Sequence, residues 1–151
     1  MNDFIIQPAQ PGDEKEIFRM IRELGEYENL SDRITGNADM LRHELFEKKS
    51  AEVICAKLGS EYIGYALFFT SFSTFLCRSG IYLEDLYISP HCRDKGYGRA
   101  LFEAVREIAS VRGAGRLEWS CLDWNEPSIK FYLSLGAKPQ SDWTAYRISL
   151  S

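Results

Sequence analysis

The sequence lacks any long hydrophobic run. No apolar stretch approaches the roughly 20 residues that a membrane-spanning helix needs. The first residues, MNDFIIQPAQPGDEKE, also lack the basic start and the apolar stretch of a signal peptide. We therefore expect a cytoplasmic protein that has no membrane partner.

Closely spaced metal-binding residues are also missing. The chain has four cysteines and two histidines, and no CxxC pair occurs. This scatter disfavours a structural zinc site, so we expect no bound metal. Free thiols in a reducing compartment are the simplest interpretation. The residues concerned are Cys55, Cys77, Cys92, Cys121, His43 and His91.

An excess of positive charge is the third absence. The formal net charge is −4 and the pI is about 5.3, which argues against nucleic acid as the main partner. This charge is compatible with a cationic substrate. The 151 residues, 45% of them hydrophobic, are typical of a single domain with one core, which we expect to span 1–151.

Apolar periodicity predicts six strands and four helices in the order β-α-α-β-β-β-α-β-α-β, with a very short further strand near Ala137 as an open alternative. The predicted strands are 4–9, 51–58, 62–72, 80–89, 115–123 and 142–150, and the predicted helices are 11–28, 37–49, 96–113 and 125–136. Asp13 with Glu16 has capping-box spacing, and Asn37 is a candidate cap for the second helix. The fold class is α/β of the mixed α+β kind: a twisted, mostly antiparallel sheet of six to seven strands, flanked by about four helices.

The stretch SPHCRDKGYGRALF, residues 89–102, gathers positive charge around two glycines where a helix begins. The amides and partial positive charge of a helix N-terminus favour an anion, and glycine lets the backbone approach it closely. The Walker pattern is absent, and Leu101 stands where a dinucleotide motif needs its third glycine. What remains is Arg-x-x-Gly-x-Gly, formed by Arg93, Gly96 and Gly98. It indicates a phosphate site, and the alternative is a tight loop with a solvated basic rim.

This loop, lying between a strand and a helix, resembles the pyrophosphate-binding motif of the GNAT superfamily of N-acetyltransferases. FIIQPA, IRELGEYE, YLEDLYISPHCRDKGYGRALF and WNEPSIKFYLSLGA resemble successive blocks of its spermidine/spermine (diamine/thialysine) N-acetyltransferase-like subfamily. The resemblance covers nearly the whole chain in order. It implies the GNAT fold, acetyl-CoA as co-substrate and a homodimer.

The same resemblance implies a set of cofactor-binding residues. The pantetheine arm of acetyl-CoA would run beside Leu86, Tyr87 and Ile88. The pyrophosphate would be held by Arg93, Asp94, Lys95, Gly96, Tyr97, Gly98 and Arg99. The far side of the cofactor would contact Asn125, Glu126, Pro127 and Ser128. A backbone N–H of Tyr87 or Ile88 could stabilise the oxyanion if strand pairing is interrupted there.

The resemblance also implies catalytic roles. Tyr132 matches the general acid and Glu84 a carboxylate that acts as base through water, whereas Tyr27 and Glu28 match a pair that lines the amine site. Asp85 could bind substrate or hydrogen-bond nearby backbone. In a regular strand Glu84 and Asp85 face opposite sides, so only one should point at the amine. From pattern alone, Glu84 could instead be a surface charge and Tyr132 a core residue.

The expected function is transfer of an acetyl group to the primary amine of a small molecule, by direct transfer in a ternary complex. Candidate acceptors are a diamine, a polyamine or a lysine-like amino acid. Thr74, Phe75 and Leu76 stand where polyamine enzymes of the subfamily carry Asp-Pro-Trp, which favours a shorter acceptor than spermidine. The alternatives are acetylation of a protein lysine or N-terminus, and a non-catalytic acyl-CoA-binding module.

Overall fold

A computed structural model describes residues 3–150. These residues form two compact units, of which the first ends at Trp119 and the second begins at Ser120. A single domain over 1–151 stays a prediction. Within 3–150, no helix has the length and apolar character that crossing a membrane requires.

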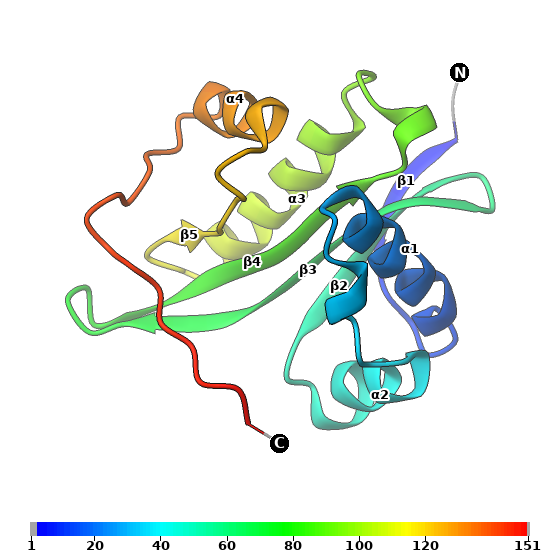
Figure 1. The fold of residues 1–151 in the computed structure, drawn as a ribbon, viewed down its shortest axis with the longest axis horizontal. Coiled ribbons are helices and arrows are strands. Elements are labelled where there is room, and N and C mark those ends of the chain that lie inside the picture. The colour runs from blue at the N-terminus through cyan, green and yellow to red at the C-terminus, as the bar shows by residue number, and fades with distance from the viewer. Residues whose placement is uncertain (1–2, 151) are drawn as a thin grey trace. The chain divides into compact units, whose positions relative to one another are not determined.

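The first unit is built on a five-stranded sheet in the order β1-β2-β3-β4-β5 (Figure 1). Its strands are β1 (Phe4–Pro8), β2 (Glu52–Leu58), β3 (Glu61–Ser73), β4 (Arg78–Ile88) and β5 (Leu117–Glu118). The first three pairings are antiparallel, and β4 pairs with β5 in parallel. The mixed, mostly antiparallel sheet expected from the sequence is confirmed, with fewer strands than the six to seven predicted.

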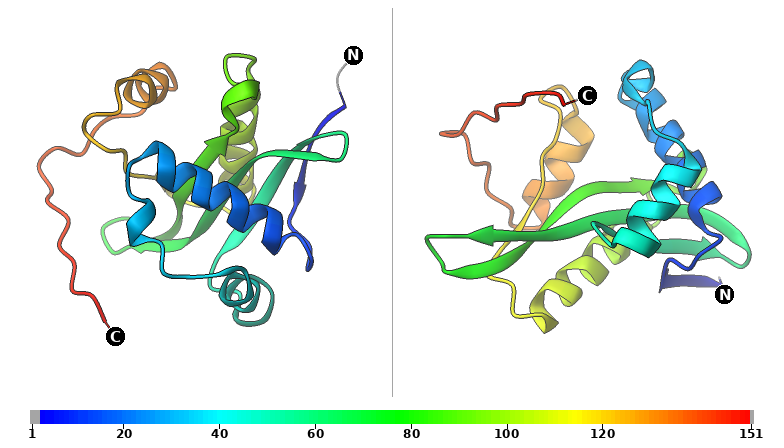
Figure 2. Two further views of the ribbon diagram at one scale, coloured as in Figure 1. Left: turned by 45° about the vertical axis from the view of Figure 1, so that its right-hand side comes forward. Right: turned by 90° about the horizontal axis from the view of Figure 1, so that it is seen from below.

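Helices cover both faces of this sheet (Figure 2). One face carries α1 (Glu14–Tyr27), the short 3-10 turn η1 (Ser31–Arg33), α2 (Ala38–Arg42) and its π-helical continuation η2 (His43–Lys48). The other face carries α3 (Tyr97–Val111), which follows the 3-10 turn η3 (Pro90–Cys92). The predicted helix 37–49 therefore exists, but its second half is wound as a π-helix.

The core beneath α1 explains why this helix forms where it does. Ile17 and Met20 recur at helical spacing and are fully buried, and they pack against Val53, Tyr65 and Tyr87 of the sheet. Each large apolar side chain buried in this way contributes about 1.5–3 kcal/mol. On the opposite face, α3 buries a stripe formed by Leu101, Phe102, Val105 and Ala109.

The helix starts were predicted with mixed success. Asn37 caps α2 by accepting a 2.8 Å hydrogen bond from the Met40 amide, as predicted. The capping box at Asp13 is wrong, because this side chain makes no cap hydrogen bond. Its oxygens instead accept from the Gln10 amide and from the Tyr62 hydroxyl, which ties the start of α1 to β3.

The second unit contains α4 (Glu126–Ser134). Asn125 caps this helix by accepting from the Ser128 amide at 3.4 Å, Pro127 occupies the first turn, and Gly136 follows the end at φ 89°. The predicted strand 142–150 does not form, nor does a short strand near Ala137. A strand needs a hydrogen-bonded neighbour, and no described residue pairs with this segment.

Candidate active site

A β-bulge divides β4 into two halves. Tyr65 lies opposite Tyr87 and Leu67 lies opposite Asp85, but Phe68 lies opposite Leu83. Glu84 is therefore an extra residue without a cross-strand partner. Bulges are common next to active sites, where they redirect side chains.

The bulge changes which side chains of β4 face α1. Asp85 pairs with Leu67, which packs against the core beneath α1. Before the bulge, Tyr82 pairs with Phe69 and stacks on it at 5.2 Å, on this same face, although it lies three residues from Asp85. The regular alternation expected for Glu84 and Asp85 is thus broken, and the expectation that they face opposite sides has no basis in this strand.

Asp85 is held by a buried tyrosine. The Tyr65 hydroxyl donates a 2.8 Å hydrogen bond to Asp85 Oδ2, and Tyr65 itself is 0% exposed. Burial raises the pKa of Asp85 to about 6, against the hydrogen bond from Tyr65, which lowers it. Burial and the neighbouring Asp85 raise the pKa of Tyr65 well above its usual value, so its hydroxyl remains a donor.

Two further carboxylates act on Asp85, and both are negative. Glu84 is its exposed neighbour at the bulge, and Glu28 caps the C-terminal end of α1. Each raises the pKa of Asp85 through charge repulsion. Among residues 3–150, none of these three carboxylates forms an ion pair with Lys, Arg or His. The cluster of Glu28, Glu84 and Asp85, called here the acidic cluster, therefore favours an external cation.

Arg93 connects the glycine loop with the end of α1. Its guanidinium lies 4.8 Å from the ring centroid of Tyr27 and 5.8 Å from that of Tyr87, and its Nε donates to the Ile88 carbonyl oxygen at 2.9 Å. The Tyr87 hydroxyl donates to Glu23 of α1 at 2.7 Å. Burial and this bond raise the pKa of Tyr87 to about 12. The side chain of Arg93 thus turns inward, and Tyr27 with Glu28 is brought beside β4.

The glycine loop has the backbone shape of an anion site. Asp94 has φ 63° and Gly96 has φ 86°, both left-handed, and α3 begins at Tyr97. Successive amides in such turns form concavities that bind anions. A Cβ added at Gly96 would meet no atom within 4 Å, so the space beside it is open. Lys95 and Arg99 are exposed there, and the loop fits a pyrophosphate group.

The outer edge of β4 is open along its second half. Pairing with β5 joins Ile81 to Leu117 and Tyr82 to Glu118, and no strand of the described chain pairs with this edge beyond Tyr82. The condition set above for a free backbone donor near Tyr87 and Ile88 is therefore met. Leu86 is half-buried along the same stretch, and an extended pantetheine chain fits an edge of this kind.

The second unit carries the remaining predicted residues. Glu126 and Pro127 are exposed in the first turn of α4, whereas Asn125 is buried and Ser128 is half-buried. Tyr132 is half-buried on α4, and its ring centroid lies 5.6 Å from that of Phe131.

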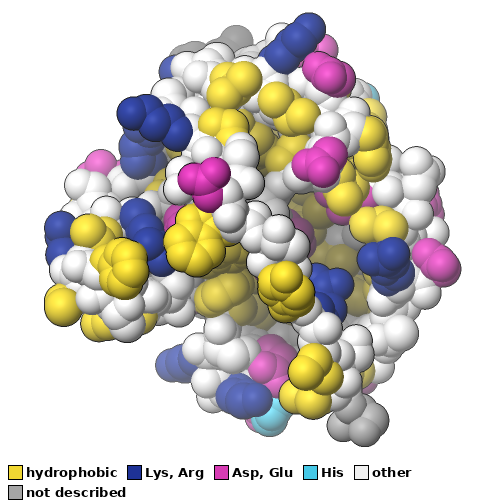
Figure 3. Space-filling view, turned by 60° about the vertical axis from the view of Figure 1, so that its left-hand side comes forward, with side chains coloured by type: hydrophobic (Ala, Val, Ile, Leu, Met, Phe, Trp, Pro, Cys, Tyr) yellow, Lys and Arg dark blue, Asp and Glu magenta, His cyan; other side chains and the backbone are white. Residues whose placement is uncertain are grey.

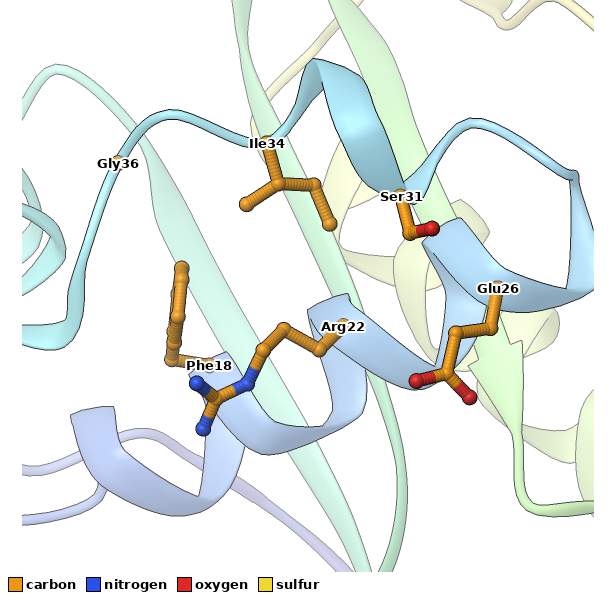
Figure 4. Close-up of a pocket in the computed structure, with 6 residues that line it drawn as sticks. All are labelled: Phe18, Arg22, Glu26, Ser31, Ile34 and Gly36. Carbon is orange, nitrogen blue, oxygen red and sulfur yellow. The ribbon is translucent and has the colours of Figure 1, made fainter.

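A surface pocket lies elsewhere on the first unit, beside α1 (Figure 4). It is lined by Phe18, Arg22, Glu26, Ser31, Ile34 and Gly36, none of which was predicted for the site. Within 3–150, no group of three or more His, Cys, Asp or Glu side chains could hold a metal ion.

Sequence reasoning missed Tyr65 and the bulge at Glu84. Tyr65 belongs to an apolar strand, YIGYALFF, and carries no motif. Only the register of β3 against β4 brings its hydroxyl to Asp85.

Comparisons of sequence place the chain among known proteins. Residues 17–137 match the family described as Acetyltransferase (GNAT) family. The chain is 35% identical to the thialysine N-epsilon-acetyltransferase of Sus scrofa, over 97% of this chain and 93% of that protein. It is 26% identical to the spermidine/spermine N(1)-acetyltransferase-like protein 1 of Homo sapiens, over 99% of this chain and 23% of that protein. The resemblance drawn from the motifs is confirmed.

A solved structure shares the fold. An integron cassette protein from V. cholerae has a TM-score of 0.81 at 24% identity, covering 97% of this chain and 92% of that one. At this identity the likeness shows the fold alone, and it agrees with the sheet and helices described above.

Proposed function

Because the chain belongs to the GNAT family of acetyltransferases, we propose that it moves an acetyl group from acetyl-CoA to a primary amine of a small molecule, by direct transfer in a ternary complex. GNAT acetyltransferases use acetyl-CoA as co-substrate. The observation that carries the choice of an amine is the acidic cluster of Glu28, Glu84 and Asp85. These carboxylates have no cationic partner among residues 3–150, and a protonated amine supplies one.

When bound, acetyl-CoA supplies an activated acetyl thioester. The loop amides from Arg93 to Arg99 would hold its pyrophosphate, with positive charge from Lys95 and Arg99. The open edge of β4 beside Leu86, Tyr87 and Ile88 would hold the pantetheine arm. In the second unit, residues 125–128 would contact the far side of the cofactor.

The chain's own groups handle the protons. An alkylamine has a pKa near 10, so it arrives charged and must lose a proton before it attacks. A carboxylate of the Glu84–Asp85 pair receives that proton, and a backbone N–H at the open edge of β4 stabilises the charge that develops on the carbonyl oxygen. Tyr132 gives a proton to the departing sulfur.

For the acceptor we propose a short diamine or a lysine-like amino acid. The similar proteins include thialysine N-epsilon-acetyltransferases and, at 38% identity over 57% of this chain, an L-ornithine N5-acetyltransferase of Arabidopsis thaliana. Thr74, Phe75 and Leu76 form the exposed turn between β3 and β4, and they offer no carboxylate to a distant ammonium group. A long polycation therefore has less to bind.

The test measures acetyl-CoA-dependent thiol release with thialysine, lysine, ornithine, putrescine, spermidine and a basic peptide. We expect the largest kcat/KM with a short diamino compound. Release with the peptide alone would favour protein acetylation instead. Acetyl-CoA binding without release from any acceptor would favour a non-catalytic acyl-CoA-binding module.

We also propose a homodimer in the cytoplasm. The first unit exposes Phe72 by 63% and Phe75 by 94% near the tip of the β3–β4 hairpin. The second unit exposes Tyr146, Ile148 and Leu150 by 86–93%. Hydrophobic side chains are also visible among charges of both signs in the space-filling view (Figure 3). Contiguous exposed apolar patches mark protein–protein interfaces, and the tip of the β3–β4 hairpin is our candidate for one. Light scattering should give twice the mass of 17.3 kDa, and Phe75→Ser should shift it toward the monomer.

A further inference from the structure

We propose that Asp85, oriented by the buried hydroxyl of Tyr65, is the group that takes the proton from the amine, and that Tyr65 is a positioning residue for this step. The inference rests on the proposed function and goes beyond it, because the family resemblance assigns the base to Glu84 and gives Tyr65 no role. It departs from the sequence expectation for a structural reason, namely the bulge in β4.

The bulge separates the two carboxylates by environment. Glu84 is the unpaired, exposed residue, whereas Asp85 pairs with Leu67 and lies on the face covered by α1. A solvated carboxylate can already satisfy its charge with water. Asp85 is half-buried and has no cationic partner among residues 3–150, so it has less water around it and gains more from a bound ammonium group.

Tyr65 fixes the geometry of the acceptor. Its hydroxyl occupies Asp85 Oδ2 at 2.8 Å, and no hydrogen bond to Oδ1 is present within residues 3–150. Tyr65 is fully buried on the central strand β3, so this hydroxyl has little freedom to move. One oxygen of Asp85 is thus held, and the other remains for the amine.

The step balances as a single proton transfer. An N–H bond of the ammonium group breaks and an O–H bond forms on Asp85 Oδ1, leaving a neutral amine and a neutral carboxyl. The amine nitrogen then has its lone pair for attack. The carboxyl later returns the proton to water, which restores the carboxylate.

The surroundings make Asp85 a better proton acceptor than an ordinary carboxylate. Burial raises its pKa to about 6, and the negative charges of Glu84 on β4 and Glu28 at the end of α1 act in the same direction. Tyr65 on β3 opposes them through its hydrogen bond. A base is most effective when its pKa lies near the working pH.

Because these groups change the pKa of Asp85 in opposite directions, substituting them should shift the pH profile in opposite directions. With a short diamine and saturating acetyl-CoA, kcat/KM is measured from pH 5 to pH 9. The wild type should lose activity below about pH 6. Tyr65→Phe removes the hydrogen bond that stabilises the carboxylate of Asp85. The acidic limb of the pH profile, where kcat/KM falls as the pH is lowered, should therefore move to higher pH by about 0.5–1 unit. Glu84→Gln removes a repelling charge, so the acidic limb of its pH profile should move to lower pH.

Asp85→Asn should lose the acidic limb, with kcat lowered about 100-fold or more. Tyr62→Phe is the matched control, because Tyr62 also donates to an aspartate, Asp13, from the same strand but outside the site. It should leave the limb in place. A Tyr65 of merely structural importance would change kcat without moving the limb.

Loss of the limb in Glu84→Gln together with its survival in Asp85→Asn would overturn the proposal and return the base to Glu84. An unmoved limb in Tyr65→Phe would remove Tyr65 from its role. Absence of thiol release from the wild type with every amine is a different result: it would overturn the proposed function, and this inference with it.

Discussion

The guanidinium of Arg93 lies 4.8 Å from the centroid of the Tyr27 ring, which joins the glycine loop to the C-terminal end of α1. The first residue of the predicted pyrophosphate motif therefore points its side chain toward the predicted amine site. We propose that its backbone faces the pyrophosphate. The side chain and the backbone of Arg93 are therefore expected to serve different ligands.

Arg93→Gln should affect the amine more than the cofactor. The substitution removes the contacts with Tyr27 and Tyr87, together worth about 0.5–2 kcal/mol, so KM for the amine should rise about 2- to 30-fold. The dissociation constant of acetyl-CoA, measured by calorimetry, should change little. Lys95→Gln is the comparison, since its exposed charge should influence acetyl-CoA instead. If Arg93→Gln weakens the amine and acetyl-CoA equally, the side chain of Arg93 does not act on the amine site alone.

Gly96→Ala should abolish most acetyl-CoA binding. Gly96 has φ 86°, and the space its new methyl group would enter is open in the protein, where we propose the pyrophosphate. Gly113→Ala is a matched control, because Gly113 has φ 73° and equally open surroundings but ends α3 far along the chain. Both variants should lose about 1–2 kcal/mol of stability through backbone strain. Only Gly96→Ala should lose the cofactor, and similar affinities in the two variants would place the anion elsewhere.

Tyr132→Phe should lower kcat about 100-fold while the affinity for acetyl-CoA stays near that of the wild type. The reason is that a phenol placed as general acid contributes to proton transfer and not to ground-state binding. Single-turnover thiol release measures the step directly. Tyr146→Phe, which changes a tyrosine that is 93% exposed, serves as control. Unchanged turnover in Tyr132→Phe would leave the acid role to another group.

The stability of Asp85→Asn relative to the wild type should be greater at pH 8 than at pH 4. Burial raises the pKa of Asp85 from 3.8 to about 6, so the stability gained from its neutral form is present below pH 4 and is lost as the pH rises through 6. A difference of about two pH units corresponds to about 3 kcal/mol. Urea unfolding of both proteins at both pH values gives the result as a double difference. A difference independent of pH would show that Asp85 titrates normally.

Much of the fold could be predicted from the sequence because local patterns determine it. The apolar spacing of Ile17 and Met20 identified the buried face of α1, and Asn37 and Pro127 marked helix starts. The glycine loop could be read for the same reason, since positive φ at Gly96 and the start of α3 are local properties. These features need no knowledge of what lies across the sheet.

The features that failed depend on partners distant in sequence. Residues 142–150 alternate in the manner of a strand, but no described strand pairs with them. Asp13 lost its predicted cap to the Tyr62 hydroxyl, which competes for the same carboxylate. The bond between Tyr65 and Asp85 depends on a register that only the folded sheet reveals.

The extra residue in β4 also shifts the alternation of this strand by one residue. The face toward α1 carries even-numbered residues before Glu84 and odd-numbered residues after it. Before Glu84, the odd-numbered Ile81 and Leu83 are buried on the α3 side, and after it, the odd-numbered Asp85 and Tyr87 turn to the α1 side. Deleting Glu84 would place Leu83 directly before Asp85, and because neighbours in a regular strand face opposite sides, both halves of β4 would keep their faces. Leu83 and Tyr87 would both stay in their cores, so Glu84 is an insertion that the packing of the sheet does not need and that alters only the backbone beside Asp85.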